Sequence, residues 1–277
     1  SVRGGEFEFV FRVPMDINYS MKNGLVNLYA IDDAHEREAK GMYDDFLLGG
    51  TEDALLNDSL GPKVQLYLNS PDFVTGDKVN ETPRLTVLLE DVDGINTVGN
   101  GIGHDLVAIV DGNASMTYVL NEYYESDLGD YTRGSVSYSL PELAEGAHSL
   151  MFRAWDMMNN ATTVIIDFEV VKGLRPRILE VSTTHSPAHE QTTFVLAHDR
   201  PETEVTVGIE VFDFSGRMLW MHKEEIITPD NTYSLDWGLC ASSGQPLATG
   251  VYLYRATVTS ASGKSTSRTH KLTILRR

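Results

Sequence analysis

The chain has one cysteine, which is its most direct candidate for covalent chemistry, because a thiolate paired with an imidazole is a strong nucleophile. This residue, Cys240, is the single cysteine among 277 residues, so an internal disulfide is excluded. No histidine lies near it in the sequence, and the chain has no Gly-x-Ser-x-Gly motif of serine hydrolases. We therefore expect this chain to carry no catalytic residue.

A loop rich in aspartate and asparagine is the strongest candidate for a ligand site. It lies between two apolar runs, at residues 85–89 and 106–110, that have the composition of buried strands. Hard oxygen ligands of this kind are those that calcium prefers. The spacing differs from that of an EF-hand loop, and the same residue types also favour turns without any metal. Calcium is the only cofactor that the sequence suggests, and its candidate ligands are Asp91, Asp93, Asn96 and Asp105.

Four tyrosines in an acidic segment form a second candidate site, for a protein or glycan partner. Tyrosine combines an apolar ring with a hydroxyl group and is frequent in binding faces. The same rings could instead pack against a neighbouring part of the chain, and packing is the interpretation that we favour. The candidate partner-binding residues are Tyr118, Tyr123, Tyr124 and Tyr131.

Short strands must position these residues, because apolar side chains alternate or cluster in short runs along nearly the whole chain. No segment has a sustained helical period, so we predict an all-β chain of tandem immunoglobulin-like β-sandwiches, preceded by a partial β-sandwich segment. Linker-like composition near residues 57–62 and 172–176 marks the boundaries. The predicted parts are residues 1–61, the end of an upstream β-sandwich; residues 62–173, an immunoglobulin-like β-sandwich; and residues 174–277, a C-terminal β-sandwich.

The first part contains only three predicted strands, too few for an independent domain. Residues 6–13 alternate between apolar and polar side chains and should pair with residues 25–31 in a hairpin. Residues 32–43 are polar and suggest a loop or a weak helical turn, and residues 44–48 could form the third strand. The chain does not begin with Met or with a leader sequence. We therefore expect it to be a piece of a longer polypeptide.

The acidic charge of the chain is unevenly distributed. The net charge is −18, and the first 174 residues hold 29 acidic against 11 basic residues, whereas the last 103 residues hold 11 of each. Such a negative field repels nucleic acid and anionic lipid and can also simply aid solubility. No apolar run approaches the roughly 20 residues of a membrane helix. We therefore expect no nucleic-acid partner and no membrane-spanning segment.

Several short strings occur in a defined order along the chain. They are residues 9–20, 29–30, 61–69, 93–97, 101–105, 120–124, 154–156 and 159–160, followed by 211–217, 237–238 and 244–252. The first eight resemble the region after the peptidase domain in type IX secretion system sortases, a family of gingipain-like cysteine peptidases of Bacteroidetes, over about residues 6–171. The last three resemble, more weakly, the C-terminal sandwich of type IX cargo proteins and of the sortase itself.

The resemblance implies a non-catalytic scaffold or docking region of an exported protein, at the cell surface or associated with the outer membrane. The full protein would remove the C-terminal signal of cargo and attach the cargo to an anionic lipopolysaccharide. Its catalytic Cys and His would lie in an upstream peptidase domain of the same polypeptide, and Cys240 matches no nucleophile motif. Further implied partners are an outer-membrane β-barrel protein and cargo C-terminal domains. The alternatives are a surface adhesin or glycan-binding module of tandem β-sandwiches, and a calcium-stiffened stalk.

Overall fold

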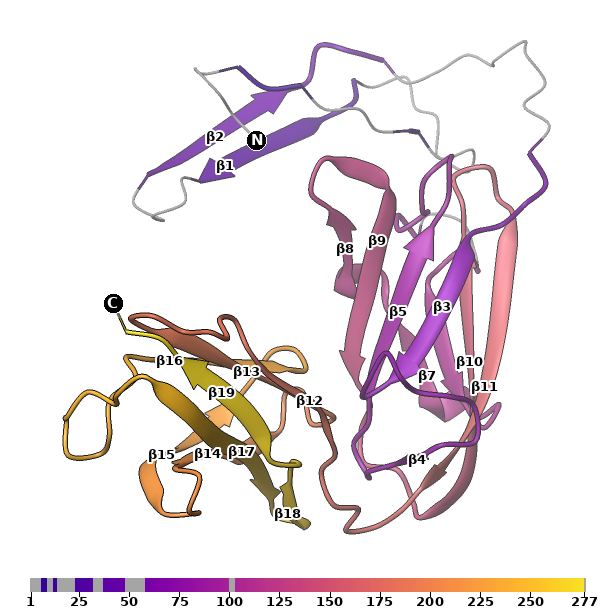
Figure 1. The fold of residues 1–277 in the computed structure, drawn as a ribbon. Helices are drawn as coiled ribbons and strands as arrows, with labels where there is room; N and C mark the ends of the chain where they lie inside the picture. The colour runs from indigo at the N-terminus through magenta and orange to yellow at the C-terminus, as the bar shows by residue number, and fades with distance from the viewer. Residues whose placement is uncertain are drawn as a thin grey trace. The chain divides into compact units, whose positions relative to one another are not determined.

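The regular secondary structure of the described residues consists almost entirely of strands (Figure 1). The computed structural model describes residues 6–8, 12–13, 23–31, 37–47, 58–99 and 103–276. Apart from strands, these residues form two short 3₁₀ turns, η1 (Ala114–Met116) and η2 (Asn121–Tyr123). The predicted all-β class is thereby confirmed. Among the described residues there is no helix long and apolar enough to cross a membrane.

The first sheet is a hairpin of β1 (Val26–Ile31) and β2 (Glu38–Tyr43). The prediction of a strand near residues 25–31 is confirmed, but its partner is β2, where we expected a loop or helical turn. Residues 44–47 form no strand, so the strand predicted at residues 44–48 is wrong over its described part. Of the strand predicted at residues 6–13, residues 9–11 lie outside the described residues, and their described neighbours form no strand.

The middle of the chain forms two sheets, as an immunoglobulin-like sandwich requires. One sheet has the order β3-β5-β9-β8 and the other the order β4-β11-β10-β6-β7. The apolar runs of the sequence predict strands at residues 64–69, 85–89, 106–110, 116–120, 134–140, 148–155 and 162–171, which correspond to all of these strands except the two-residue β4 and the short β8. Their bounds are β3 (Lys63–Leu68), β4 (Lys78–Val79), β5 (Arg84–Glu90), β6 (Val107–Val110), β7 (Thr117–Val119), β8 (Tyr124–Asp127), β9 (Asp130–Ser139), β10 (Gly146–Trp155) and β11 (Ala161–Val170).

The last part of the chain also forms two sheets. Their orders are β12-β13-β16 and β15-β14-β17-β18, and β19 also pairs with β17. The composition of residues 266–275 predicts one strand there, but the structure has two, β18 and β19, because residues 267–269 belong to no strand. The bounds are β12 (Ile178–Thr183), β13 (Thr192–His198), β14 (Glu204–Phe212), β15 (Met218–Ile227), β16 (Thr232–Trp237), β17 (Gly250–Ser260), β18 (Gly263–Thr266) and β19 (His270–Ile274).

The chain divides into two compact units, and their boundaries fall within or beside strands. The first unit comprises Ser1–Gln65, Val87–Val136 and Leu150–Ile165, and the second Leu66–Thr86, Ser137–Ser149 and Ile166–Arg277. The three-part division at residues 61 and 173 therefore stays a prediction.

Each unit has its own apolar core, produced by the two-residue period of its strands. In the first unit β6 and β10 pair antiparallel, and Val110 lies opposite Leu150, both fully buried. In the second unit the core centres on Phe194, whose ring centroid lies 5.5 Å from that of Trp237 and 5.2 Å from that of Tyr254. Burying aromatic rings of this size contributes several kcal/mol of stability.

Candidate functional site

Three aspartates form the one group of metal-ligand side chains found among the described residues. Carboxylate oxygens of Asp58, Asp91 and Asp93 all lie within 4.8 Å of one another. Asp91 and Asp93 are buried, with 8% and 9% of their surface exposed, and Asp58 is partly buried. We call these three residues the acidic cluster.

The acidic cluster is positioned by the ends of strands. Asp91 follows β5 directly, and its backbone N–H donates to the carbonyl of Thr132 in β9 at 2.8 Å. The backbone N–H of Asp93 then donates to the Asp91 Oδ1 atom at 2.8 Å, which closes a tight turn. Gly94 ends this turn with φ +92°, and a Cβ atom there would lie 3.1 Å from the Tyr131 ring. The turn therefore needs glycine for its backbone and for its packing.

A fourth carboxylate, that of Asp156, lies fully buried at the end of β10 and organises the next turn. It accepts hydrogen bonds from the backbone N–H groups of Met158 at 2.9 Å and Asn160 at 2.7 Å. The Asn160 side-chain amide donates to Asp156 Oδ2 at 2.8 Å and to the carbonyl of Asp58 at 3.3 Å. This amide therefore joins the turn after β10 to the acidic cluster.

The electrostatics of the acidic cluster disfavour a full set of negative charges. Burial raises the pKa of Asp91 from its ordinary 3.8 to about 6, and the nearby charges of Asp156 and Asp58 add to that effect. The Arg12 guanidinium forms an ion pair with Asp93 and offsets part of this repulsion. A cation bound among these oxygens would act in the same direction as Arg12, and calcium has the matching preference for carboxylate ligands.

The structure brings together only part of the calcium set predicted from sequence. Asp91 and Asp93 meet, but Asp105 lies outside the acidic cluster. Its Oδ1 atom accepts instead from the side-chain amide of Asn121 at 2.9 Å. The Asn96 Oδ1 atom accepts from the backbone N–H of Val98 at 3.1 Å.

Asp58, which lies 33 residues before Asp91, is not among the ligands predicted from sequence. Asp58 comes just before β3, and the start of β3 lies beside the end of β5, where Asp91 follows. This position in the sequence was the signal that could have pointed to Asp58. The ion pair between Lys63 and Glu90, 3.8 Å from nitrogen to oxygen, marks this proximity.

The four candidate tyrosines do not share one element. Tyr118 lies in β7 of one sheet, and Tyr124 and Tyr131 lie in β8 and β9 of the other. The Tyr124 ring lies so close to Gly134 that a Cβ atom there would approach its hydroxyl to 2.5 Å. Burial raises the pKa of the Tyr124 hydroxyl to about 12. Tyr124 and Tyr131, over Gly94, thus pack within their unit, while Tyr123 remains 47% exposed.

Cys240 lies in the connection between β16 and β17 and is partly buried. Its thiol donates to the carbonyl of Gly238 at 3.3 Å, and its own carbonyl accepts from the Trp237 indole N–H at 3.1 Å. The Arg276 guanidinium donates to the carbonyls of Leu239 and Leu247 on either side. The contacts around Cys240 therefore stabilise a loop conformation.

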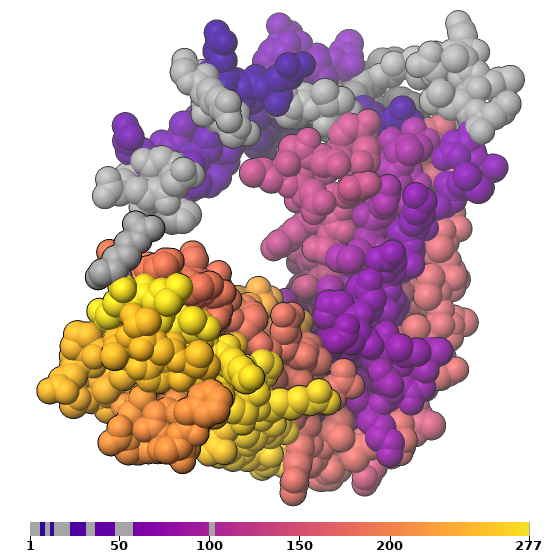
Figure 2. All heavy atoms as spheres, viewed as in Figure 1, coloured from indigo at the N-terminus to yellow at the C-terminus, as the bar shows by residue number. Residues whose placement is uncertain are grey.

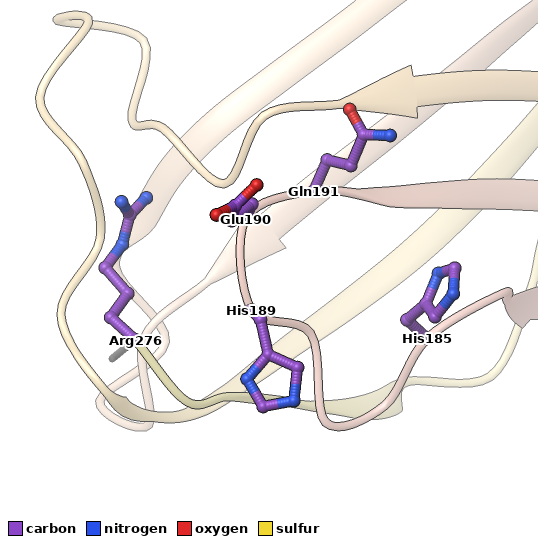
Figure 3. A pocket seen from close by; sticks show the side chains of 5 residues that line it. All are labelled: His185, His189, Glu190, Gln191 and Arg276. Atoms are coloured by element: carbon purple, nitrogen blue, oxygen red, sulfur yellow. The ribbon is translucent and has the colours of Figure 1, made fainter.

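A polar hollow of about 600 Å³ lies where the β12–β13 connection meets the C-terminal end of the chain (Figure 3). Among the described residues, those that line it are His185, His189, Glu190, Gln191 and Arg276. His189 is fixed by a contact of 2.7 Å between its Nδ1 atom and the carbonyl of Leu275. The two imidazole rings lie apart in Figure 3, and these residues do not form a metal-ligand group. This hollow could not be predicted from sequence, because Arg276 lies 85 or more residues away from the other residues that line it.

No protein-family model matches the chain, and no curated protein does. Among solved structures, the crystal structure of dimeric latent PorU from Porphyromonas gingivalis is 33% identical to it, over 96% of this chain, with a TM-score of 0.47. The chain resembles part of PorU. It spans 25% of the PorU chain, so the resemblance concerns about a quarter of that protein.

Two other solved structures are similar at lower identity. The tandem Ig repeats of Dlar are 10% identical over 78% of this chain and 99% of that chain, with a TM-score of 0.27. A tetra-tandem repeat in the extending region of a large adhesion protein is 16% identical over 91% of this chain and 57% of that chain, with a TM-score of 0.28. These values say nothing of function.

Proposed function

We propose that this chain is a non-catalytic scaffold and docking region of a PorU-like type IX secretion sortase at the cell surface. The observation that carries the proposal is the 33% identity to PorU along 96% of the chain. The matching strings identified in the sequence cover both the middle and the last part of the chain, so the likeness is not confined to one motif.

The rigidity of the described residues is consistent with a scaffold that binds other domains. The two apolar cores are dense with fully buried side chains, and the turn at the acidic cluster is fixed by backbone hydrogen bonds and by Gly94. Rigid sheets with fixed loops present a surface at little entropic cost on binding. Such a region would hold an upstream peptidase domain of the same polypeptide, and it would dock an outer-membrane β-barrel protein or the C-terminal domains of cargo.

Under this proposal bond cleavage takes place on a peptidase domain and not on this chain. Cys240 is the residue to test, because it is the only thiol. Its hydrogen bond to Gly238 and the loop contacts around it support a structural role.

The test is an activity assay on the purified chain with fluorogenic peptides that carry a type IX cargo cleavage site. Wild type and Cys240→Ser should give the same background rate. Turnover that is lost in Cys240→Ser would overturn the proposal. Specific glycan binding, together with no affinity for type IX components, would instead support the adhesin or glycan-binding alternative.

A further inference from the structure

The sheet that contains β14, β15, β17 and β18 has one face in the core of the second unit and one face away from it. Along β14, Val207 and Ile209 belong to the core. Successive positions of a strand face opposite sides of the sheet, so Thr206, Gly208 and Glu210 lie on the other side, which we call the outer face. The orange to yellow atoms of the last part of the chain, which includes this sheet, are visible at the surface in Figure 2.

Gly208 leaves a gap in the middle of the outer face. The register places it between Lys223 of β15 and Thr257 of β17. A glycine inside a strand weakens the strand and often marks a site that a ligand or another backbone approaches closely. A Cβ atom at this position would lie 2.5 Å from Thr257 Oγ1, so the packing of Thr257 by itself accounts for the glycine. The case for a ligand therefore depends on the space that remains beside these two residues.

That space is a hollow of about 280 Å³ on the outer face, and Gly208 lines its floor. It lies just below the range of roughly 300–1,000 Å³ that is usual for drug-sized ligands, so it suits a smaller one. The next row of the sheet adds to its walls, because Thr206 lies opposite Thr259, which lies opposite Lys264. The hydrogen-bond donors that line the hollow are three hydroxyl groups and two ammonium groups, those of Thr206, Thr257, Thr259, Lys223 and Lys264.

Most of these donors are available to a ligand. Within the part of the chain that the structure describes, neither Lys223 nor Lys264 takes part in an ion pair or a side-chain hydrogen bond. The Thr257 hydroxyl donates to the carbonyl of Gly208 only at 3.5 Å, which is the long limit for a hydrogen bond.

The hollow has an excess of positive charge. Glu210 is the one carboxylate among the described residues that line it. Its charge is matched by Arg255, whose Nε atom lies 2.5 Å from Glu210 Oε2. The two lysine ammonium groups are therefore left to attract an anion, and they lie on different strands, β15 and β18, on either side of Gly208.

We propose that this hollow binds the phosphate group of a small soluble compound. Lysine binds phosphate as a compact point charge, and hydroxyl groups supply further hydrogen bonds to the phosphate oxygens. A carboxylate ligand would instead match the planar fork of an arginine, and Arg255 is already engaged by Glu210.

The charge distribution of the chain favours a soluble compound over a lipid surface. The first 174 residues hold 29 acidic against 11 basic residues and would repel an anionic membrane, whereas the last 103 residues are balanced. A small ion responds mainly to charges within the screening length of about 8 Å. This site goes beyond the proposed function and does not depend on it, because all its residues lie in the last part of the chain.

The test is a titration of the isotope-labelled 277-residue chain with inorganic phosphate, followed by amide chemical shifts at neutral pH and constant ionic strength. The amides of Gly208, Thr257 and Thr259 should shift and saturate. Lys223→Gln and Lys264→Gln should each weaken the binding by about tenfold, because each removes a charge-assisted contact. Lys271→Gln is the matched control, since Lys271 lies opposite Leu253 on the same outer face but does not line the hollow.

Shifts that do not saturate would overturn the proposal, as would equal shifts when chloride replaces phosphate. Equal weakening by Lys271→Gln would also overturn it, because binding would then reflect the general charge of the face. The second arm adds vesicles that contain phosphatidylglycerol. Binding of the chain to these vesicles, without a saturable response to inorganic phosphate, would overturn the proposal in favour of a membrane surface.

Discussion

The buried Asp91 carboxylate should make the fold less stable at neutral pH than at pH 4. Its pKa in the folded chain is about 6, against an ordinary value of 3.8, because burial and the charges of Asp156 and Asp58 disfavour ionisation. A difference of this size corresponds to at most about 3 kcal/mol. Solvent screening at this carboxyl group reduces the effect further, so we expect about 1–2 kcal/mol.

The sign follows from proton linkage. Between pH 4 and pH 6 the folded chain keeps the Asp91 proton and the unfolded chain loses it, so the contribution of Asp91 to the free energy of unfolding falls as the pH rises through this window. Asp91→Asn removes the ionisation but keeps an oxygen that can accept from the Asp93 N–H. This variant should therefore be more stable than wild type at pH 8 by about 1–2 kcal/mol, and this advantage should vanish near pH 4.

The assay is urea denaturation of both proteins in EDTA at several pH values between 4 and 8, followed by tryptophan fluorescence. The difference between variant and wild type isolates Asp91 from the other titrating groups. Asp105→Asn is the control, since Asp105 belongs to the same loop but lies outside the acidic cluster. A difference for Asp91→Asn that does not change with pH would refute the electrostatic account.

Three further predictions concern the acidic cluster and the core. Calcium at about 100 times its Kd should add about 2.7 kcal/mol to the free energy of unfolding at pH 8. Asp91→Asn should remove that gain. A melting temperature that neither calcium nor chelator changes would exclude the site. Burial and the charge of Arg200 lower the pKa of His198 from 6.5 to about 4. The contribution of His198 to the free energy of unfolding should therefore fall by up to about 3 kcal/mol as the pH drops through that range. His198→Asn should lack this loss in urea titrations at pH 7 and 4.5. Phe194→Ala should lower the free energy of unfolding by about 3–5 kcal/mol in the same assay. Phe214→Ala, at a side chain that is 69% exposed, should change it by no more than about 0.5 kcal/mol. Similar losses in the two variants would contradict the assignment of the core.

Strands with one buried face could be predicted from sequence, because every second side chain in them is apolar. β5 is an example, with Leu85, Val87 and Leu89 buried on one side. β2 could not be predicted, since all its residues are exposed and Glu, Ala and Lys favour other structures. β2 is recognised as a strand only from its hydrogen-bonded pairing with β1, because no burial pattern marks it.

The acidic cluster could be predicted only in part, for a related reason. Asp91 and Asp93 belong to one turn, which the local run of aspartate and glycine predicts. Asp58 comes from a distant segment and reaches them only through the pairing of β3 with β5. The four tyrosines lie on different elements, and this placement depends on topology, which residue composition does not specify. Their role in binding a partner stays a prediction.

The central claim is that this chain holds and presents protein partners. It is tested most directly by isothermal titration of the purified chain with a folded type IX cargo C-terminal domain and with the outer-membrane β-barrel protein, alongside a glycan array. We predict saturable binding of at least one of these two proteins, without cleavage. Binding of neither protein, together with specific glycan recognition, would contradict the claim.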